Sequence, residues 1–193
     1  MTVKILDVGS GSESIATVIF GEIEDKQIVR MDADPDNCPD ILHDITQPLP
    51  EELRGQFDLV LAAHVMEHIP RDHVVNSFRH VFSAVRDRGE VWVIVPSLEW
   101  AASEIVNKRD GVHVQALLYG AQTSALQNHL CGFTLASLRQ MVEVCGLLVR
   151  KAYQSPFTII VHDKQYSAIQ NIVIGARVDM LEDPAEALAE AVV

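Results

Sequence analysis

The stretch "ILDVGSGSES", residues 5–14, joins a short apolar run to a glycine-rich turn. Gly9 and Gly11 follow the apolar run, and Glu13 stands where a third glycine would complete a dinucleotide-binding pattern. Glycine lacks a Cβ, so the main chain of such a turn can come close to a ligand. The stretch therefore predicts a buried strand that leads into a ligand-binding loop, with one acid, Asp7, before the loop and another, Glu13, after it.

Strand and helix patterns alternate along the rest of the chain. Strands are expected at Val3–Val8 and within "QIVRMDADP", "DILHDI", "FDLVLAAHV", "GEVWVIVP", "LLVRKAY" and "QNIVIGARV", with "FTIIVHD" extended between the last two. Helices are expected at residues 12–20, capped by Ser12 or Ser14, at residues 71–86, and in "TLASLRQMVEVCG", from a Thr134 cap to Gly146. This alternation predicts an α/β fold with a parallel sheet covered by helices.

Two segments carry weaker patterns. Residues 97–132 are expected to be a loop with one or two short helices, forming either a lid or a fixed insertion. Residues 1–178 are expected to form one domain, and the acidic residues 179–193 a tail or short helix.

Composition limits the classes of partner. The chain has 193 residues and a formal net charge of −12, and its Lys and Arg are scattered, which disfavours a nucleic-acid-binding face. Three widely spaced cysteines indicate free thiols, and no apolar run is long enough to span a membrane. We expect a cytoplasmic protein without membrane contact.

The polar residues of the expected strands gather where those strands end. Residues 7–11, 32–34, 44 and 63–68 follow four strands, and the carboxyl ends of parallel strands meet at one edge of a sheet. Asp7 and Glu13 would repel the pyrophosphate of a dinucleotide. S-adenosylmethionine instead carries an ammonium and a sulfonium, which acids attract. The acids therefore favour S-adenosylmethionine.

The chain resembles the class I S-adenosylmethionine-dependent methyltransferases, close to the type 11 group. The resemblance lies in "ILDVGSGSE", "RMDADPD", "HDITQPLP", "FDLVLAAHVMEHI" and "GEVWVIVPS", which occur in the family's order over residues 3–97. It implies a Rossmann-like, doubly wound, mostly parallel seven-stranded sheet, with helices on both faces and an antiparallel late strand.

The resemblance also implies roles for individual residues. Asp7 would hold the methionine ammonium, and Asp32 would accept hydrogen bonds from the ribose hydroxyls. The remaining cofactor-binding residues would be Gly9, Ser10 and Gly11 beside the methionine and ribose, Ala33, Asp44 and Ile45 around the adenine, and Ala63 near the methyl group. Asp7 and Asp32 could alternatively be turn-forming residues at strand ends.

The chain departs from the family at its start, because the helices that usually precede the first strand are absent. We therefore expect an open cofactor pocket, or one covered by residues 97–132, by a second copy of the chain or by a partner subunit.

Histidines offer the candidate catalytic groups. His64, after the fourth strand, and His129, in "LQNHLCGF", are the candidates for a general base. "HVMEHIP" also groups His64, Glu67 and His68, but this spacing is common in helical turns, so no metal site is expected.

The sequence thus favours methyl transfer to a small-molecule, sugar-like or carrier-presented acceptor. The tetrapeptide of Asn or Asp, two prolines and an aromatic residue, typical of DNA and protein amide methylases, is replaced by "AAHV". The alternatives are a catalytically weak methyltransferase-like subunit that supports a partner and, less favoured, an NAD-dependent oxidoreductase.

Overall fold

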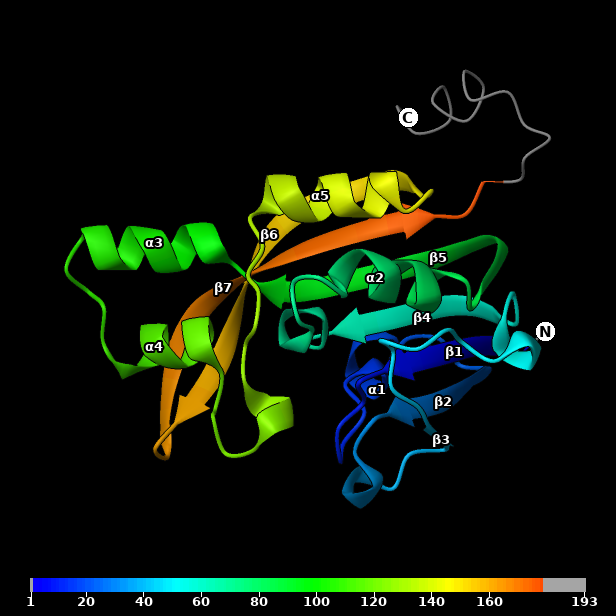
Figure 1. The fold of residues 1–193 in the computed structure, drawn as a ribbon, viewed down its shortest axis with the longest axis horizontal. Coiled ribbons are helices and arrows are strands. Elements are labelled where there is room, and N and C mark those ends of the chain that lie inside the picture. Colours follow the sequence, from blue (N-terminus) through cyan, green and yellow to red (C-terminus); the bar gives the residue numbers. More distant parts are fainter. Residues whose placement is uncertain (1, 179–193) are drawn as a thin grey trace.

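The computed structural model describes residues 2–178. Within them the strands are β1 (Val3–Val8), β2 (Lys26–Asp32), β3 (Ile41–Leu42), β4 (Phe57–Ala63), β5 (Val85–Pro96), β6 (Leu148–Val161) and β7 (Lys164–Ala176). They form one sheet in the order β3-β2-β1-β4-β5-β7-β6 (Figure 1). The first five strands pair in parallel, and β7 runs antiparallel to both β5 and β6. The expected seven-stranded, mostly parallel sheet with an antiparallel late strand is confirmed.

Helices cover both faces of this sheet. They are α1 (Ala16–Ile19), α2 (Val74–Phe82), α3 (Leu98–Val106), α4 (Val112–Tyr119) and α5 (Leu135–Val144), with short 3-10 turns η1 (Pro35–Asn37), η2 (Glu51–Leu53), η3 (Met66–His68) and η4 (Ala125–Gln127). Side chains alternate between the faces along a strand. In β1, Leu6 and Val8 join the core beneath α2 and α5, whereas Ile5 joins the core beneath α1.

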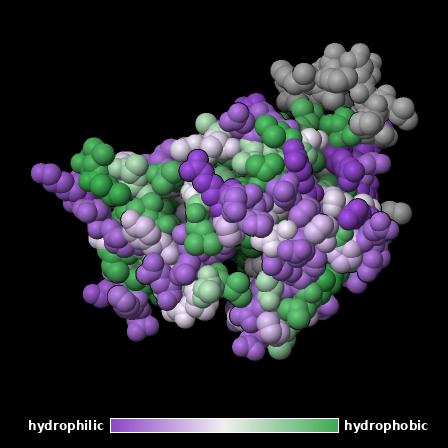
Figure 2. Space-filling model, in the orientation of Figure 1, coloured by the Kyte–Doolittle hydropathy of each residue, from purple (hydrophilic) through white to green (hydrophobic). Residues whose placement is uncertain are grey.

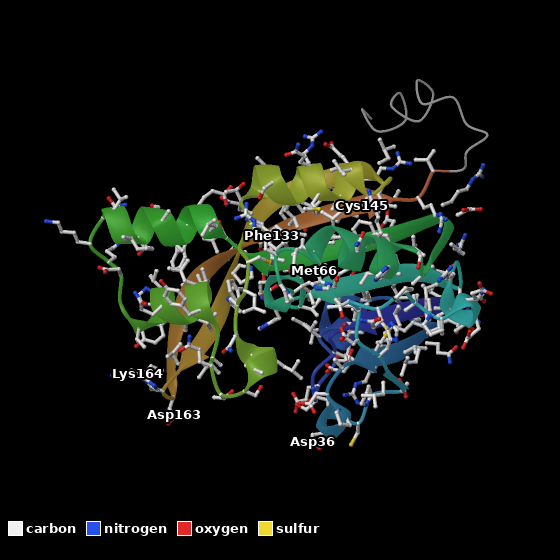
Figure 3. All side chains as sticks on the ribbon, in the orientation of Figure 1. Asp36, Met66, Phe133, Cys145, Asp163 and Lys164 are labelled. Atoms are coloured by element: carbon white, nitrogen blue, oxygen red, sulfur yellow. The ribbon has the colours of Figure 1, made fainter. Side chains whose placement is uncertain are left out.

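The α3 and α4 helices lie beyond the carboxyl ends of the parallel strands. There β6 and β7 continue as a long hairpin, and α3 and α4 pack against it through a third apolar cluster that contains Ala101, Val114, Leu117 and Ala168 (Figure 1). Asp163 and Lys164 lie at the tip of this hairpin, at the lower left of Figure 3. Asp36, in η1, lies at the lower centre of the same view. The loops that follow the parallel strands therefore face α3, α4 and the β6–β7 hairpin across the end of the sheet.

Two expected helices are shorter in the structure. Only Ala16–Ile19 of the expected helix 12–20 is helical, and its N-cap, Ile15, makes no side-chain capping bond. The Ser14 hydroxyl bonds to Asp7 instead, so neither Ser12 nor Ser14 is the cap. The expected helix 71–86 begins at Val74 and ends at Phe82, because the chain from Val85 onwards already pairs with β4.

The late helix agrees with its expectation. The Thr134 side chain accepts the Ser137 N–H, and the Ser137 hydroxyl accepts the Thr134 N–H, which is a complete capping box. No helix among residues 2–178 has the length and apolar content to cross a membrane. The expected acidic tail or short helix at residues 179–193 lies outside the described residues.

Candidate functional site

The glycine loop after β1 depends on its two glycines for different reasons. Gly9 has φ +65°, and a Cβ there would lie 2.5 Å from Cγ2 of Val65, in the loop after β4. Gly11 has φ +61°, but a Cβ there would meet no atom within 4 Å. Gly9 is therefore required by close packing as well as by backbone conformation, whereas Gly11 leaves open space beside the loop.

Asp32, at the end of β2, holds this loop in place. Its Oδ2 accepts the Gly11 N–H at 2.8 Å, and its Oδ1 accepts the Asp34 N–H at 2.9 Å. Each carboxylate oxygen has a further lone pair for a ligand. Asp32 therefore both shapes the loop and offers acceptors beside it.

Arg30 supports the glycine loop, and sequence reasoning could not have found it, because a single arginine on a strand is common. Its Nη2 donates to the carbonyl oxygens of Gly11 and of Asn37, the latter at 2.7 Å. The guanidinium thus joins the glycine loop to η1. A charged donor at this point also offsets the carboxylates nearby.

Asp7 is buried behind the glycine loop, with 1% of its surface exposed. Its Oδ2 accepts the Ser14 hydroxyl at 2.5 Å, and the carboxylate also accepts the Ala16 N–H at the start of α1. Burial raises the pKa of this carboxyl group above its ordinary value, although these hydrogen bonds oppose the rise. Glu13, expected in the first helical turn, precedes α1 and is exposed.

A cavity of about 600 Å³ lies against these loops. Of the residues expected to bind a cofactor, its wall contains Gly9, Gly11, Asp32, Ala33, Asp44 and Ile45. Asp7, Ser10 and Ala63 are buried and do not line this cavity. The structure therefore brings six of the nine expected residues to the wall of one cavity, and the other three are buried residues outside that wall.

Sequence reasoning missed several apolar and polar residues of the same wall. Val65, Ile69 and Pro70 come from the loop after β4, Asn37 from η1 and Leu126 from η4. The sequence alone could not identify these residues, because they come from separate segments that only the fold brings to one cavity.

A second cavity, of about 690 Å³, adjoins the first. Its wall is formed by α4, the segment after α4, and the β6–β7 hairpin, and His64 and His68 line both cavities. The space-filling view is notched at its lower edge, between the η4 segment and η1 (Figure 2). Two ligands bound in the two cavities would therefore meet at His64 and His68.

His64 is held at this shared wall by its main chain and by both ring nitrogens. It adopts φ +53° and donates its N–H to the Ile94 carbonyl at 2.8 Å. Its Nε2 lies 3.0 Å from Oε1 of Gln170, and its Nδ1 lies 3.4 Å from Oε1 of Glu67, an ionic contact rather than a well-formed hydrogen bond. Burial lowers the pKa of His64, but the Glu67 carboxylate outweighs it, so the pKa is raised overall.

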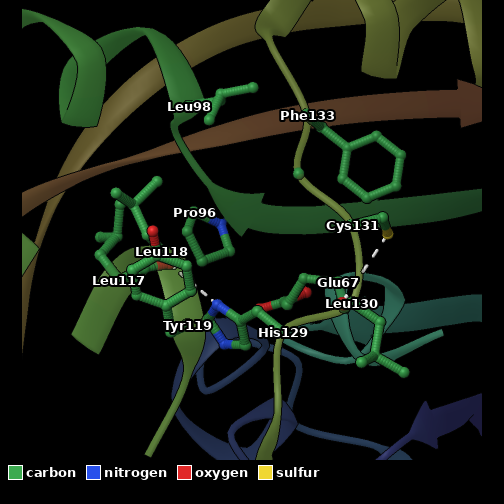
Figure 4. A pocket seen from close by; sticks show the side chains of 11 residues that line it. Glu67, Pro96, Leu98, Leu117, Leu118, Tyr119, His129, Leu130, Cys131 and Phe133 are labelled. Carbon is green, nitrogen blue, oxygen red and sulfur yellow. Dashed lines mark hydrogen bonds between the residues drawn. The ribbon is translucent and has the colours of Figure 1, made fainter. Parts of the chain in front are cut away.

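His129, the other catalytic candidate, lines the second cavity and not the first. Its Nδ1 donates to the Leu117 carbonyl at 2.8 Å, and burial lowers its pKa. It also borders a smaller cavity of about 220 Å³, where the Glu67 side chain extends toward the His129 ring (Figure 4). Burial and Glu67 together raise the pKa of the neighbouring Cys131 thiol to about 12, so this thiol stays protonated.

The residues that line the first cavity suit a cationic nucleoside better than a phosphate group. The first cavity is lined by three carboxylates, Asp32, Asp34 and Asp44, and none of its described lining residues is Lys or Arg. A glycine loop after β1, an acid at the end of β2 and this acidic lining define a Rossmann-like fold of the methyltransferase class.

Comparison with known proteins agrees with this class. A family model described as a methyltransferase domain matches residues 3–152. No curated protein matches the chain in sequence. The chain therefore belongs to the methyltransferase domain family, and it is an S-adenosylmethionine-dependent methyltransferase with S-adenosylmethionine as its cofactor.

Solved structures share the fold at low sequence identity. A structure described as the conversion of a disulfide bond into a thioacetal group during echinomycin biosynthesis has a TM-score of 0.65 at 14% identity and covers 99% of this chain and 82% of its own. An S-adenosylmethionine-dependent methyltransferase from Methanosarcina mazei has a TM-score of 0.64 at 12% identity and covers 92% and 93%. Burkholderia thailandensis 1,6-didemethyltoxoflavin-N1-methyltransferase, with bound S-adenosylhomocysteine, has a TM-score of 0.59 at 11% identity and covers 92% and 72%.

Proposed function

We propose that this protein transfers the methyl group of S-adenosylmethionine to a small-molecule acceptor, among which we include sugar-like metabolites and groups presented on a carrier. The observation that carries the proposal is the wall shared by the two cavities. The first cavity has the glycine loop and acids that suit the cofactor, and the second shares His64 and His68 with it. A methyl donor and an acceptor bound in these cavities would be adjacent.

Different residues of the first cavity would bind different parts of the cofactor. Asp32 would accept the ribose hydroxyls with its remaining lone pairs, and Ala33, Asp44 and Ile45 would surround the adenine. Asp7 would act from beneath the glycine loop, through its negative charge, on the methionine ammonium. These proposed roles are supported by the position of each residue near the carboxyl end of a parallel strand, where ligands of such sheets bind.

The lining of the second cavity favours a neutral, partly apolar acceptor. Leu117, Tyr119 and Phe157 supply apolar and aromatic surface, and Glu67 is the one carboxylate among the described lining residues, which include no Lys or Arg. A polyanion such as nucleic acid would find no Lys or Arg among these lining residues, in agreement with the net charge of −12. The Burkholderia structural neighbour methylates a small molecule, 1,6-didemethyltoxoflavin.

Methyl transfer requires little from the protein beyond the alignment of the methyl donor with the acceptor. The cofactor, when bound, supplies a methyl group on a sulfonium whose thioether is a good leaving group. The protein must place the acceptor atom in line with that methyl group and exclude water from the contact. His64 and His129 are the groups positioned to accept a proton when the acceptor has to lose one.

The surroundings of the pocket complete the proposal. The η4 segment would cover the cofactor cavity, since Ala125, Leu126 and Gln127 line it. A second copy of the chain or a partner subunit would close what remains open. A cytoplasmic location belongs to the proposal and is supported by the three cysteines, none of which forms a disulfide.

Substitution in the second cavity tests the division between cofactor and acceptor. Ala121→Trp would fill part of that cavity at an exposed position, and Ala136→Trp, exposed on α5, is the matched control. S-adenosylhomocysteine formation is measured with an unfractionated cell extract as the source of small-molecule and carrier-presented acceptors. We expect Ala121→Trp to lose most turnover while binding S-adenosylhomocysteine normally. Cofactor binding without any turnover in the parent protein would instead favour the catalytically weak subunit.

A further inference from the structure

Glu67, His68 and His129 form a compact cluster in the wall of the second cavity. One potential ligand atom from each residue lies within 4.8 Å of the other two. Glu67 and His68 belong to η3, directly after β4, and His129 lies after η4. The Leu130 and Cys131 N–H groups donate to the Glu67 carbonyl at 2.8 and 3.1 Å. The two segments are therefore fixed to each other by their main chains.

Each of the two histidines has one ring nitrogen hydrogen-bonded to a backbone carbonyl and one ring nitrogen free to bind a metal. His68 Nδ1 lies 3.0 Å from the Asn128 carbonyl oxygen, and His129 Nδ1 lies 2.8 Å from the Leu117 carbonyl oxygen. A carbonyl oxygen can only accept, so each Nδ1 carries the proton of the neutral ring and each Nε2 keeps its lone pair. A bond from the other ring nitrogen to a backbone carbonyl is the usual second-shell support of a metal-binding histidine.

The Glu67 carboxylate accepts no well-formed hydrogen bond from the described part of the chain. The residue is 2% exposed, and neither carboxylate oxygen accepts a hydrogen bond. Its nearest charged neighbour is His64, with Nδ1 3.4 Å from Oε1. A buried carboxylate without donors is costly, and here it lies beside two further lone pairs. A cluster of acceptors with no donor between them suits a cation.

We propose that Glu67, Nε2 of His68 and Nε2 of His129 bind one divalent cation of the Zn²⁺ class. Two imidazoles and one carboxylate are ligands typical of Zn²⁺ and neighbouring transition metals, whereas Mg²⁺ and Ca²⁺ prefer oxygen ligands alone. This departs from the expectation of no metal, and it makes His129 a ligand rather than a general base. All three residues line the second cavity, so the open positions of the cation face the acceptor.

The cation would hold an oxygen atom of the acceptor beside His64, at the wall shared with the cofactor cavity. Only this role rests on the proposed methyl transfer. Cation binding itself needs neither cofactor nor acceptor, so it can be measured on the protein alone.

Cobalt titration tests the site, because the visible absorption of Co²⁺ reports its ligands. Chelator-treated protein with Cys38→Ser, which removes the exposed thiol, is titrated with CoCl2 and then with ZnCl2. We expect one equivalent of Co²⁺ to bind and to be displaced by Zn²⁺. Glu67→Gln and His129→Ala should each weaken binding at least about tenfold. His162→Asn, at the exposed turn between β6 and β7, should bind as the parent does.

The result has an internal check on folding. Glu67→Gln keeps the side-chain shape but loses the ionic contact with His64, so a cooperative thermal transition and a parent-like circular dichroism spectrum, rather than an unchanged melting temperature, show that it is folded. Absence of Co²⁺ and Zn²⁺ binding in the parent, or unchanged binding in folded Glu67→Gln and His129→Ala, would overturn the proposal. Calorimetry with S-adenosylhomocysteine on the same samples tests the methyltransferase function separately, so the failure of one leaves the other standing.

Discussion

The Gly11 N–H donates to Oδ2 of Asp32 at 2.8 Å, and this bond joins the loop after β1 to the end of β2. The other oxygen of Asp32 accepts the Asp34 N–H, so one carboxylate organises the main chain on both sides of the cofactor cavity. A ligand that uses the remaining lone pairs of Asp32 therefore binds to a loop already held in position. Binding to such a preorganised site costs little ordering entropy.

The two glycines of the loop give a matched pair of substitutions. Gly9→Ala should destabilise the fold by about 3 kcal/mol or more, because the Cβ would overlap Val65 in addition to the strain of positive φ. Gly11→Ala has the same strain without the overlap and should cost about 1–2 kcal/mol. Urea unfolding measures both. Equal losses would show that contact with Val65 is not what requires Gly9.

Asp7→Asn should stabilise the ligand-free protein at neutral pH. Burial raises the folded-state pKa of this carboxyl group, so its ionised form opposes folding. The native state holds the proton more tightly, and stability from this group is lost as pH rises through the folded pKa. The stability gained by Asn should therefore grow over that range and vanish below the ordinary pKa of Asp. Urea unfolding at several pH values measures it, and a gain independent of pH would contradict the assignment.

The same variant separates charge from loop structure in ligand binding. If the Asp7 charge acts on the methionine ammonium, Asp7→Asn should weaken S-adenosylhomocysteine by about 1.5–3 kcal/mol and leave adenosine nearly unchanged. If the bonds of Asp7 to Ser14 and Ala16 only shape the loop, both ligands should lose affinity equally.

Residues 97–132 are expected from the sequence to form either a lid or a fixed insertion, and we now predict that within them only residues 121–127 act as a lid. The α3 helix is anchored, since Glu99 accepts the Leu135 N–H at 2.7 Å and bonds to buried Asn171. Residues 121–127 are all exposed, and the paired residues Gly120 and Asn128 close the base of this loop. Hydrogen exchange with S-adenosylhomocysteine should slow in residues 121–127, with α3 and α4 protected in both states. Equal protection of the loop with and without ligand would exclude a lid.

Most of the strands could be predicted because they depend on local signals. Apolar runs bounded by glycine or proline mark β1, β2, β4 and β5, and the acids after them fall at the shared edge. Pro156 did not interrupt β6, because β6 is an edge strand and a missing N–H is tolerated there.

The ends of α1 and α2 and the histidine cluster could not be predicted, for a common reason. Each depends on a partner outside its own segment. Ser14 bonds to Asp7 instead of capping a helix, and Val85 pairs with Phe57 instead of extending α2. His129 reaches Glu67 and His68 only because the chain returns from α4 to the end of β4. Spacing within "HVMEHIP" carries no information about this third residue.

Calorimetric titration with S-adenosylhomocysteine tests the central claim, that the cavity at Asp32 binds the cofactor of a methyltransferase. The parent protein should bind S-adenosylhomocysteine and not NAD. Asp32→Ala should weaken binding by about 1–3 kcal/mol, because ribose hydroxyls and the Gly11 N–H lose their acceptor. Asp36→Ala, an exposed acid in η1, should bind as the parent does. Unchanged affinity in folded Asp32→Ala, or binding of NAD in preference to S-adenosylhomocysteine, would contradict the account.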